Sequence, residues 1–359
     1  DGDHWQSLRV NMPATSVRDV IVHGDDLIAG THGRGIWILD DITPLRQIGE
    51  ERSVKASAER SAILFKPQVA YRVRQNTNTD TPIPPDEAAG VNPPDGAIID
   101  YMLPSAASAV TLEILDAAGK SVRRYSSGDP VEHADPATAP VPVYWYRPPQ
   151  SVATTPGLHR FLFDLHYQPL RIAAGRGGLP IAAVPHDTPA APTSPWVAPG
   201  QYTVKLTVDG ASHTQPLTVK MDPRVTTPPL GLSQQFTLSK QLYDGVLAAQ
   251  KAQQEIGQLR DRSGTALAGH QAFAKKLGDL EGQAGGGFGG GRGAATTGPD
   301  TLSNITGTLT QLMNLLQGAD VTPTTQLVSA VAERRAALSK LLAQWTALKA
   351  EARTQGMTP

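Results

Sequence analysis

Short apolar runs separated by glycine and aspartate dominate residues 17–41. Runs of this length, bounded by such turn residues, are typical of antiparallel strands joined by tight turns. The segment therefore predicts three strands, which is most of one four-stranded β unit. The three runs are Val20–Val22, Leu27–Ala29 and Ile36–Leu39.

Residues 61–74 contain two more β-prone runs, one on each side of Pro67. Because proline has no N–H to donate to a ladder, Pro67 is expected at an edge or a bend. Residues 75–95 are polar and rich in proline, without apolar periodicity, and they predict an extended surface linker. We therefore group residues 1–74 with the N-terminal strands.

Period-two alternation marks residues 96–224. In GQYTVKLTVDG (200–210) every second residue from Tyr202 to Val208 is apolar, which predicts one buried and one solvated face. Six or seven such strands with Asp-Gly or Ala-Gly turns predict a β-sandwich of immunoglobulin-like shape. The proline-, alanine- and glycine-rich stretches at about 127–156 and 168–198 are expected to be long loops. The other strand candidates are AIIDYMLP, AVTLEILDAAGK, SVRRYSS, LHRFLFDLHY and ASHTQPLTVKMDP.

From residue 232 onward the apolar spacing becomes helical. Leu232 and Ser233 predict a staple and an N-cap for a helix that runs to about Arg262, and a second helix is expected at about 265–282. Two further helices have apolar residues that step by three and four. These residues are Leu302, Ile305, Leu309, Leu312 and Leu316, followed by Leu327, Val331, Leu338, Leu341, Trp345 and Leu348.

The last helix should begin at Thr322 and Pro323, a capping hydroxyl followed by a proline at the first helical position. Glycine-rich residues 284–300 predict a flexible linker between the helices. The narrow apolar stripes of these helices must be buried against other helices, which predicts a helical hairpin or bundle. Two questions stay open. The apolar seams either pack within one chain or drive association between chains. Arg334 is either a buried paired charge or the place where the seam meets solvent.

Composition narrows the classes of partner. The 32 basic and 33 acidic residues give a formal net charge of −1, which favours neither a nucleic-acid groove nor a polybasic membrane anchor. The sequence has no apolar run near the ~20 residues that span a bilayer. Thirty prolines and 34 glycines fit a loop-rich β protein, and the absence of cysteine excludes disulfides and thiolate chemistry.

Asp40 and Asp41, near His32 and Arg34, are the one cluster that resembles a pair of glycosidase carboxylates. Adjacent residues on a strand point to opposite faces, so such a pair does not easily form a catalytic dyad. We therefore expect Asp40 and Asp41 to cap the exit of a strand and Arg34 to occupy a turn, and we expect no catalytic residue in this chain.

Metal and cofactor sites are not expected either. His4, His23 and His32 match no zinc-ligand spacing, and His159 and His166 have an odd separation that places them on opposite sides of a strand. The glycine-rich stretches GRGIW and GGGFGGGRG lack the context of a nucleotide site, and there is no G-x-S-x-G elbow.

An aromatic cluster is the remaining candidate for a binding site. Tyr144, Trp145 and Tyr146 are followed by Arg147 in a segment expected to be a loop. Aromatic side chains in such a loop can stack on sugar rings or anchor a protein partner. The alternative is that the cluster packs between domains and fixes their arrangement.

The N-terminal stretch DGDHWQSL resembles the second half of the Asp-box, Ser/Thr-x-Asp-x-Gly-x-x-Trp, with Gly2 and Trp5 at the glycine and tryptophan positions. The segment GTHGRGIWILDDITPLRQ (30–47) is similar to the final-blade signature of bacterial exported Asp-box (BNR-repeat) proteins. These are sialidase-like and sortilin-like β-propellers, often labelled glycosyl hydrolases. In that family, segments similar to NPPDGAIIDY and GQYTVKLTVDG open and close a sandwich domain that precedes a helical region. The residues of the final-blade signature here are His32, Arg34, Trp37, Asp40 and Asp41.

The resemblance implies a mainly β protein with an α-helical C-terminal region. Its parts would be an incomplete β-propeller at 1–74, the linker, an Ig-like β-sandwich at 96–224 and a helical hairpin or bundle at 232–359. Trp5 would lead the closing strand of the penultimate blade. Upstream blades would come from the same polypeptide or a second chain, and the location would be secreted or periplasmic.

The expected function is that of a non-catalytic accessory region. It would dock the propeller of an exported Asp-box protein and present a surface that binds protein or glycan, without a cofactor, a nucleic acid or a membrane span. The alternative is part of a sialidase-like glycoside hydrolase whose active site lies in upstream blades.

Overall fold

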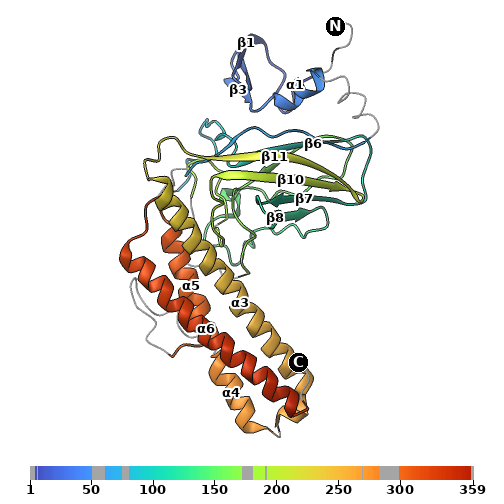
Figure 1. The fold of residues 1–359 in the computed structure, drawn as a ribbon. Helices are drawn as coiled ribbons and strands as arrows, with labels where there is room; N and C mark the ends of the chain where they lie inside the picture. Colours follow the sequence, from blue (N-terminus) through green and yellow to red (C-terminus); the bar gives the residue numbers. More distant parts are fainter. Residues whose placement is uncertain are drawn as a thin grey trace. The chain divides into compact units, whose positions relative to one another are not determined.

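The computed structural model describes Trp5 and residues 7–50, 61–74, 81–171, 181–190, 192–268, 270–282 and 299–356. The chain forms two compact units. The first comprises residues 1–168, 175–191 and 199–222 and contains the β-sheets. The second comprises residues 169–174, 192–198 and 223–359 and contains the long helices (Figure 1).

The N-terminal sheet consists of three antiparallel strands in the order β1-β2-β3. Gly24, with a φ of +61°, lies in the tight turn after β1. The three strands predicted for residues 17–41 are confirmed, whereas the helix α1 that follows them was not predicted. The elements are β1 (Val17–His23), β2 (Asp26–Thr31), β3 (Ile36–Leu39) and α1 (Thr43–Glu50).

Residues 61–74 contain the two short strands expected around Pro67, and they lie in different sheets. β4 (Ile63–Leu64) pairs with β6, and β5 (Ala70–Arg72) pairs in parallel with β11. Their pairing therefore joins residues 61–74 to the sheets of residues 96–224, although the sequence grouped them with the N-terminal strands.

Two further sheets form the body of the first unit. A five-stranded sheet has the order β5-β11-β10-β7-β8, and a three-stranded sheet has the order β4-β6-β9. The six strands predicted from alternation are confirmed, with β10 and β11 paired as a hairpin through nine residue pairs. Their bounds are β6 (Ala97–Leu103), β7 (Val110–Leu115), β8 (Ser121–Ser126), β9 (Gly157–Phe163), β10 (Gly200–Val208) and β11 (Ala211–Met221).

The two sheets face each other across an apolar core. The rings of Tyr125 on β8 and Phe161 on β9 have centroids 4.6 Å apart, which places side chains of the two sheets in contact. In β10 the alternating Tyr202, Val204 and Leu206 are buried, as predicted. Further buried core residues are Ile99, Leu103, Val110, Leu112, Ile114, Phe163, Leu217 and Val219.

Gly96 is required where β6 begins. Its φ is +120°, a conformation that residues with a side chain rarely adopt. A Cβ at this position would lie 2.1 Å from the carbonyl oxygen of Phe163. Only glycine therefore lets β6 start against the end of β9.

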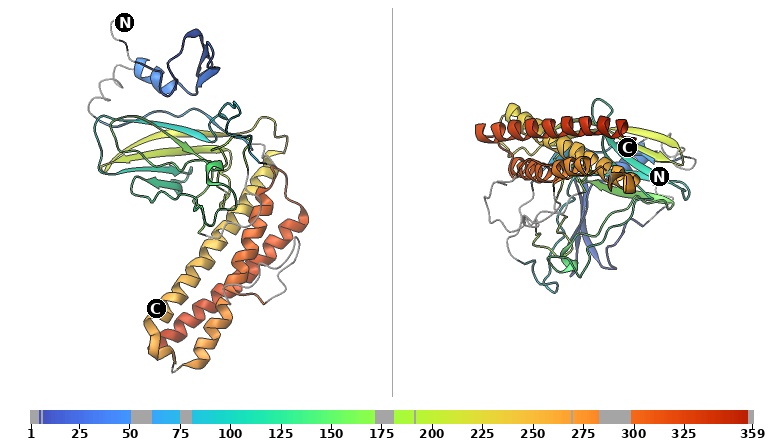
Figure 2. Two further views of the ribbon diagram at one scale, coloured as in Figure 1. Left: turned by 180° about the vertical axis from the view of Figure 1, so that it is seen from behind. Right: turned by 90° about the horizontal axis from the view of Figure 1, so that it is seen from below.

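The second unit is a bundle of α-helices. Figures 1 and 2 show α3, α5 and α6 running side by side, with α4 beside one end of α6. The bounds are α3 (Pro229–Ala268), α4 (Gln271–Glu281), α5 (Leu302–Gln317) and α6 (Thr325–Thr354). The seams of α5 and α6 are buried inside the chain at Leu302, Ile305, Leu309, Met313, Leu316, Val331, Leu338, Leu341, Trp345 and Leu348.

Four details of the helices differ from the sequence predictions. α3 runs to Ala268 rather than to about Arg262, and α4 begins at Gln271 rather than at about 265. α3 begins at Pro229, so the expected staple and cap at Leu232 and Ser233 lie within the helix. Proline fits the first turn of a helix, where its missing N–H needs no partner. The cap of α6 is Thr324, whose hydroxyl accepts a hydrogen bond from the N–H of Leu327, and not Thr322. On α5, Met313 and not Leu312 is the buried residue.

Arg334 is paired with an acid. Its Nη1 lies 2.9 Å from Oδ1 of Asp300, and the side chain is 35% exposed.

The mixed β and α architecture predicted from the sequence is confirmed. The glycine-rich linker at 284–300 lies almost wholly outside the described residues, and the propeller stays a prediction.

Candidate functional site

The N-terminal sheet carries apolar side chains at the centre of both of its faces, with Asp19, His23 and Asp26 at the ends of the face that carries Ile21. Directly opposed residues of antiparallel strands point to the same face. Ile21 pairs with Ile28, which pairs with Ile38, so these three side chains form a row across the sheet. Ile36, two residues before Ile38, lies on the same face. We call this the isoleucine face: Ile21, Ile28, Ile36 and Ile38.

The opposite face has its own apolar rows. Val22 pairs with Leu27, and Leu27 pairs with Leu39. Val20 pairs with Ala29, and Ala29 pairs with Trp37. We call this the valine face: Val20, Val22, Leu27, Ala29, Trp37 and Leu39.

Both faces are open to solvent. On the isoleucine face Ile21 is 51% exposed and Ile36 is 74% exposed. On the valine face Val20 and Val22 are 54% and 56% exposed. Sheets with one solvated face normally alternate apolar and polar residues, whereas sheets covered on both sides are apolar throughout. The composition of this sheet is therefore that of a sheet covered on both faces.

A buried aspartate ends the N-terminal sheet. Asp41 is buried and has a φ of +52°. Its Oδ1 accepts three hydrogen bonds: from the N–H of Thr43 at 3.0 Å, from the hydroxyl of Thr43 at 2.6 Å and from Nε2 of Gln68 at 2.7 Å. The N–H of Asp41 donates to Oδ1 of Asp26 at 2.9 Å. Asp41 thus lies at the exit of β3 and accepts the first N–H of α1, a helix that the sequence did not predict. Three donors on one oxygen make it a structural carboxylate.

Arg160 on β9 connects this turn to the three-stranded sheet. Its Nε and Nη2 donate to the two carboxylate oxygens of Asp100, each at 3.0 Å. Its Nη1 donates to the carbonyl of Asp40 at 2.5 Å, and its Nη2 donates to the carbonyl of Asp41 at 2.7 Å. Asp100 and Arg160 are cross-strand partners in β6 and β9, so sheet register places both side chains on one face.

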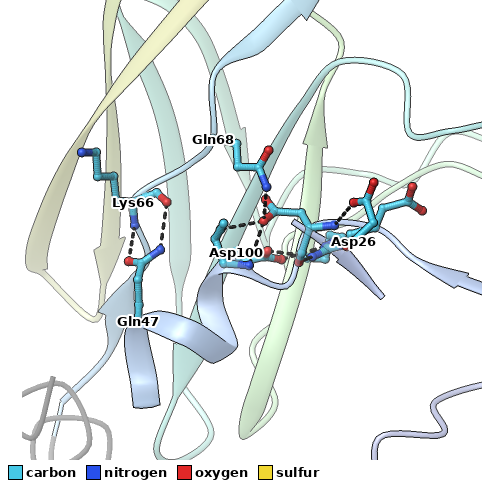
Figure 3. A network of polar contacts seen from close by, with 9 residues as sticks. Asp26, Gln47, Lys66, Gln68 and Asp100 are labelled. Atoms are coloured by element: carbon cyan, nitrogen blue, oxygen red, sulfur yellow. Dashed lines mark hydrogen bonds and ion pairs between the residues drawn. The ribbon is translucent and has the colours of Figure 1, made fainter. Parts of the chain in front are cut away.

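Neutral side chains extend the same junction (Figure 3). Gln68 reaches Asp41, and the amide of Gln47 on α1 forms a two-way contact with the backbone of Lys66. In that contact the Gln47 Nε2 donates to the Lys66 carbonyl at 3.1 Å, and its Oε1 accepts from the Lys66 N–H at 3.0 Å. We call the residues Asp41, Gln47, Gln68, Asp100 and Arg160 the junction. The hydrogen bonds of these side chains hold the neighbouring backbone segments in place.

Negative charge accumulates at the junction. Burial raises the pKa of the Asp100 carboxyl, although its bonds to Arg160 oppose the rise. Burial and the neighbouring Asp26 raise the pKa of the Asp40 carboxyl. These shifts show that ionising either carboxylate costs free energy in the folded chain.

The other residues of the final-blade signature form the β2–β3 turn. Gly33 and Gly35, with φ of +77° and +71°, flank Arg34, which confirms its place in a turn. The indole N–H of Trp37 donates to the carbonyl of Arg34 at 2.9 Å. His32 is joined to the chain before β1 through its N–H, which donates to the carbonyl of Ser16.

The aromatic segment is held by a neighbouring loop. The N–H of His186 donates to the carbonyl of Tyr144, the N–H of Thr188 to that of Trp145, and the N–H of Arg147 to that of Thr188. The rings of Tyr144 and His186 meet edge to face at 6.2 Å. Tyr144 is 44% exposed, and Tyr146 forms a parallel bridge with Thr188.

Arg147 is an ion-pair centre. Its Nη2 lies 2.9 Å from Oδ1 of Asp187, and its Nη1 lies 3.6 Å from Oδ2 of Asp95. Burial raises the pKa of Asp95, against the attraction of Arg147. Arg147 therefore fixes the two loops together, which leaves Tyr144 as the exposed ring of the cluster.

Sequence reasoning missed one buried polar cluster. Arg123, on the edge strand β8, lies opposite Ile114, and its guanidinium is 4.8 Å above the ring of Tyr125. Burial lowers the pKa of His166. An inward-pointing charge on an edge strand discourages edge-to-edge pairing. The adjacent arginines of SVRRYS were the available signal, because alternation places one of them inside.

The remaining candidates lie apart. Gly2 and His4 are outside the described residues, and Trp5 is 88% exposed and belongs to no strand, so the strand expected at Trp5 is not observed. Among the described residues, no group of three or more His, Cys, Asp or Glu side chains is placed to hold a metal ion. The helices that were described include none long and apolar enough to cross a membrane.

Comparison with known proteins gives little further direction. No protein-family model matches the chain, and no curated protein matches it. Among solved structures the chain is similar to CopC from Methylosinus trichosporium OB3b, with 13% sequence identity and a TM-score of 0.17. The alignment covers 44% of this chain and 98% of CopC. At this TM-score the similarity supports no statement about fold or function.

Proposed function

We propose that the chain is a non-catalytic accessory region of an exported Asp-box β-propeller protein. In this proposal the β1–β3 sheet is a propeller blade that packs between neighbouring blades, and the facing sheets form an Ig-like sandwich. The same region presents a surface that binds protein or glycan. The resemblance of residues 30–47 to the final-blade signature supports it.

The observation that carries the proposal is the apolar character of both faces of the sheet. A blade inside a propeller is covered on both sides, so both of its faces must be apolar. Contiguous exposed apolar side chains of this kind mark a surface that another protein element covers. In this proposal Arg160 and Asp100 of the junction hold the blade against the sandwich.

Hydrogen exchange on the protein from its native source tests the docking. We expect residues 17–39 to exchange slowly there and fast in the isolated chain, and we expect a native polypeptide or complex with a mass well above 38.0 kDa. A native species of 38.0 kDa, with residues 17–39 as unprotected as in the isolated chain, would overturn the proposal.

A matched pair of variants locates the docking surface. Ile38→Ser removes an isoleucine from the isoleucine face, and Ile83→Ser makes the same change at a residue that is 38% exposed outside the sheet. The first variant should lose the protection of residues 17–39 in the native assembly, and the second should keep it. Equal protection in both variants would contradict docking through this face.

Tyr144 is the residue of the proposed binding surface that is easiest to test. Immobilised oligosaccharides and sialylated glycoproteins serve as probes for the native protein. Tyr144→Ala should weaken binding at least tenfold, since an exposed aromatic ring contributes much of the contact energy. Tyr71→Ala, at a tyrosine that is 47% exposed on β5, should leave it unchanged. Equal binding by both variants would remove Tyr144 from the surface.

A further inference from the structure

The outer edge of β1 is an unprotected strand edge. β1 is the terminal strand of its sheet, and all seven of its residues are exposed. Among the described residues, no other strand pairs with this edge. Its sequence, VRDVIVH, contains neither proline nor lysine. The ladder with β2 shifts register between Val17 and Asp19, so the regular part of the open edge runs from Asp19 to His23.

Two other sheet edges are covered by side chains or loops. On β8, the N–H of Gln168 donates to the carbonyl of Val122, and Oε1 of Gln168 accepts from the N–H of Arg124. On β9, the side chain of Gln150 bonds both the N–H and the carbonyl of Leu162. Among the described residues, the edge of β1 has no cover of this kind.

β1 is self-complementary about Ile21. If two copies of β1 pair antiparallel with Ile21 opposite Ile21, Asp19 of each copy lies opposite His23 of the other. Val20 then lies opposite Val22 on the reverse face. Opposed pairs of these kinds stabilise a sheet, and like charges directly opposite destabilise it.

Neighbouring registers lack this complementarity. A shift of one residue places Val22 opposite Asp19 in one direction and Val20 opposite His23 in the other. A slip also changes which apolar residues share a face. The apolar residues of β1 thus favour one register.

We propose that β1 pairs antiparallel with β1 of a second copy of this chain, in the register centred on Ile21, and forms a continuous six-stranded sheet across a two-fold axis. This goes beyond the proposed function, because it uses the edge of the sheet while blade docking uses its faces. The opposed pairs Ile21–Ile21 and Val20–Val22 set the register.

Cysteine cross-linking tests the register directly, because the chain has no cysteine of its own. Directly opposed residues in an antiparallel pair have Cα atoms about 4.5–5.5 Å apart, within the range that a disulfide spans. Under mild oxidation of the full chain, Ile21→Cys should therefore form a covalent dimer.

Asp19→Cys is the matched control. The two copies of residue 19 would be four residues apart along the strands, about 13 Å, which is too far for a disulfide. It should not cross-link with itself, whereas a mixture of Asp19→Cys and His23→Cys chains should yield the mixed dimer. Equal cross-linking of all single variants, or of none, overturns the register.

Sedimentation equilibrium of the unmodified chain tests the association independently of any variant. We expect a species with twice the 38.0 kDa mass. Ile21→Lys should raise the dissociation constant at least tenfold, and Ile36→Lys, on the same face but on β3, should not. A monomer at all concentrations overturns the pairing without touching blade docking, which is read from the protection of the two faces in the native assembly.

Discussion

The guanidinium of Arg160 holds the carboxylate of Asp100 through two parallel hydrogen bonds of 3.0 Å each. From the chain that follows the N-terminal sheet, the same guanidinium binds backbone and not a carboxylate: it donates to the carbonyls of Asp40 and Asp41. The link between the N-terminal sheet and the three-stranded sheet therefore depends on the forked guanidinium, a geometry that only arginine provides.

Replacing Arg160 with lysine should weaken the first unit although the charge is kept. One ammonium cannot serve Asp100 and two carbonyls together, so we expect a loss of about 2 kcal/mol in the free energy of unfolding. Urea unfolding followed by tryptophan fluorescence measures it. Arg124→Lys, at a 52% exposed arginine that lies 3.8 Å from Asp129, should change stability by less than about 0.5 kcal/mol. Equal losses would show that the fork has no special role.

Asp40→Asn should stabilise the chain at neutral pH. The pKa of Asp40 is raised in the folded chain above its ordinary 3.8, so the folded state favours the protonated form. The stability that this group contributes is complete below pH 3.8 and is lost as the pH rises through the raised pKa. Asparagine stays neutral and escapes this loss.

The free energy of unfolding, measured against pH, checks this prediction. The variant's advantage should be present at pH 7 and should disappear as the pH falls toward 3.8. Glu132→Gln, at an exposed carboxylate in the long loop after β8, serves as the control and should produce no comparable change. An advantage for Asp40→Asn that does not vary with pH would show that charge is not its source.

Gly96→Ala should be among the most damaging single substitutions. The new Cβ would meet the backbone of Phe163 at 2.1 Å, in addition to the strain of φ +120°. We expect a loss of more than about 3 kcal/mol, or failure to fold. Gly119→Ala, at a φ of +76° with open space around it, should cost only about 1 kcal/mol. Thermal unfolding of both variants separates the clash from the strain.

Leu309→Ala should destabilise the helical bundle by about 2–5 kcal/mol, because the side chain is fully buried and leaves a cavity. Leu315→Ala, on the same helix but 62% exposed, should change stability by less than about 0.5 kcal/mol. Urea unfolding followed by the helical circular dichroism signal measures both. If the seams joined different chains, the loss for Leu309→Ala would depend on protein concentration, which we do not expect.

Much of the fold followed from the periodicity of the sequence. Strands of six or more residues, such as β10, were predictable from the alternation of apolar and polar residues, and the helical seams from apolar spacings of three and four. The two short strands β4 and β5 were expected, but their sheets were not. A strand of two or three residues has too little pattern to indicate its partner.

The junction was only half predictable. The place of Asp41 at the exit of a strand was predicted, whereas its contact with the start of α1 was not. Its link to Arg160 depends on the register of β6 and β9. One signal was available: Asp100 and Arg160 are opposite charges inside otherwise apolar strands, and such charges need partners. The apolar valine face was also visible in the sequence, but the pairing that opposes its members was not.

The parallel pairing of β5 with β11 has a consequence for the order of events during synthesis. Residues 70–72 are synthesised early, but β5 cannot join the five-stranded sheet until residues 219–221 have been made. The apolar strands made in between are exposed to other nascent chains during that interval. A translational pause before β11 is available would therefore prolong the exposure of these strands, because β11 is the strand that joins β5 to β10.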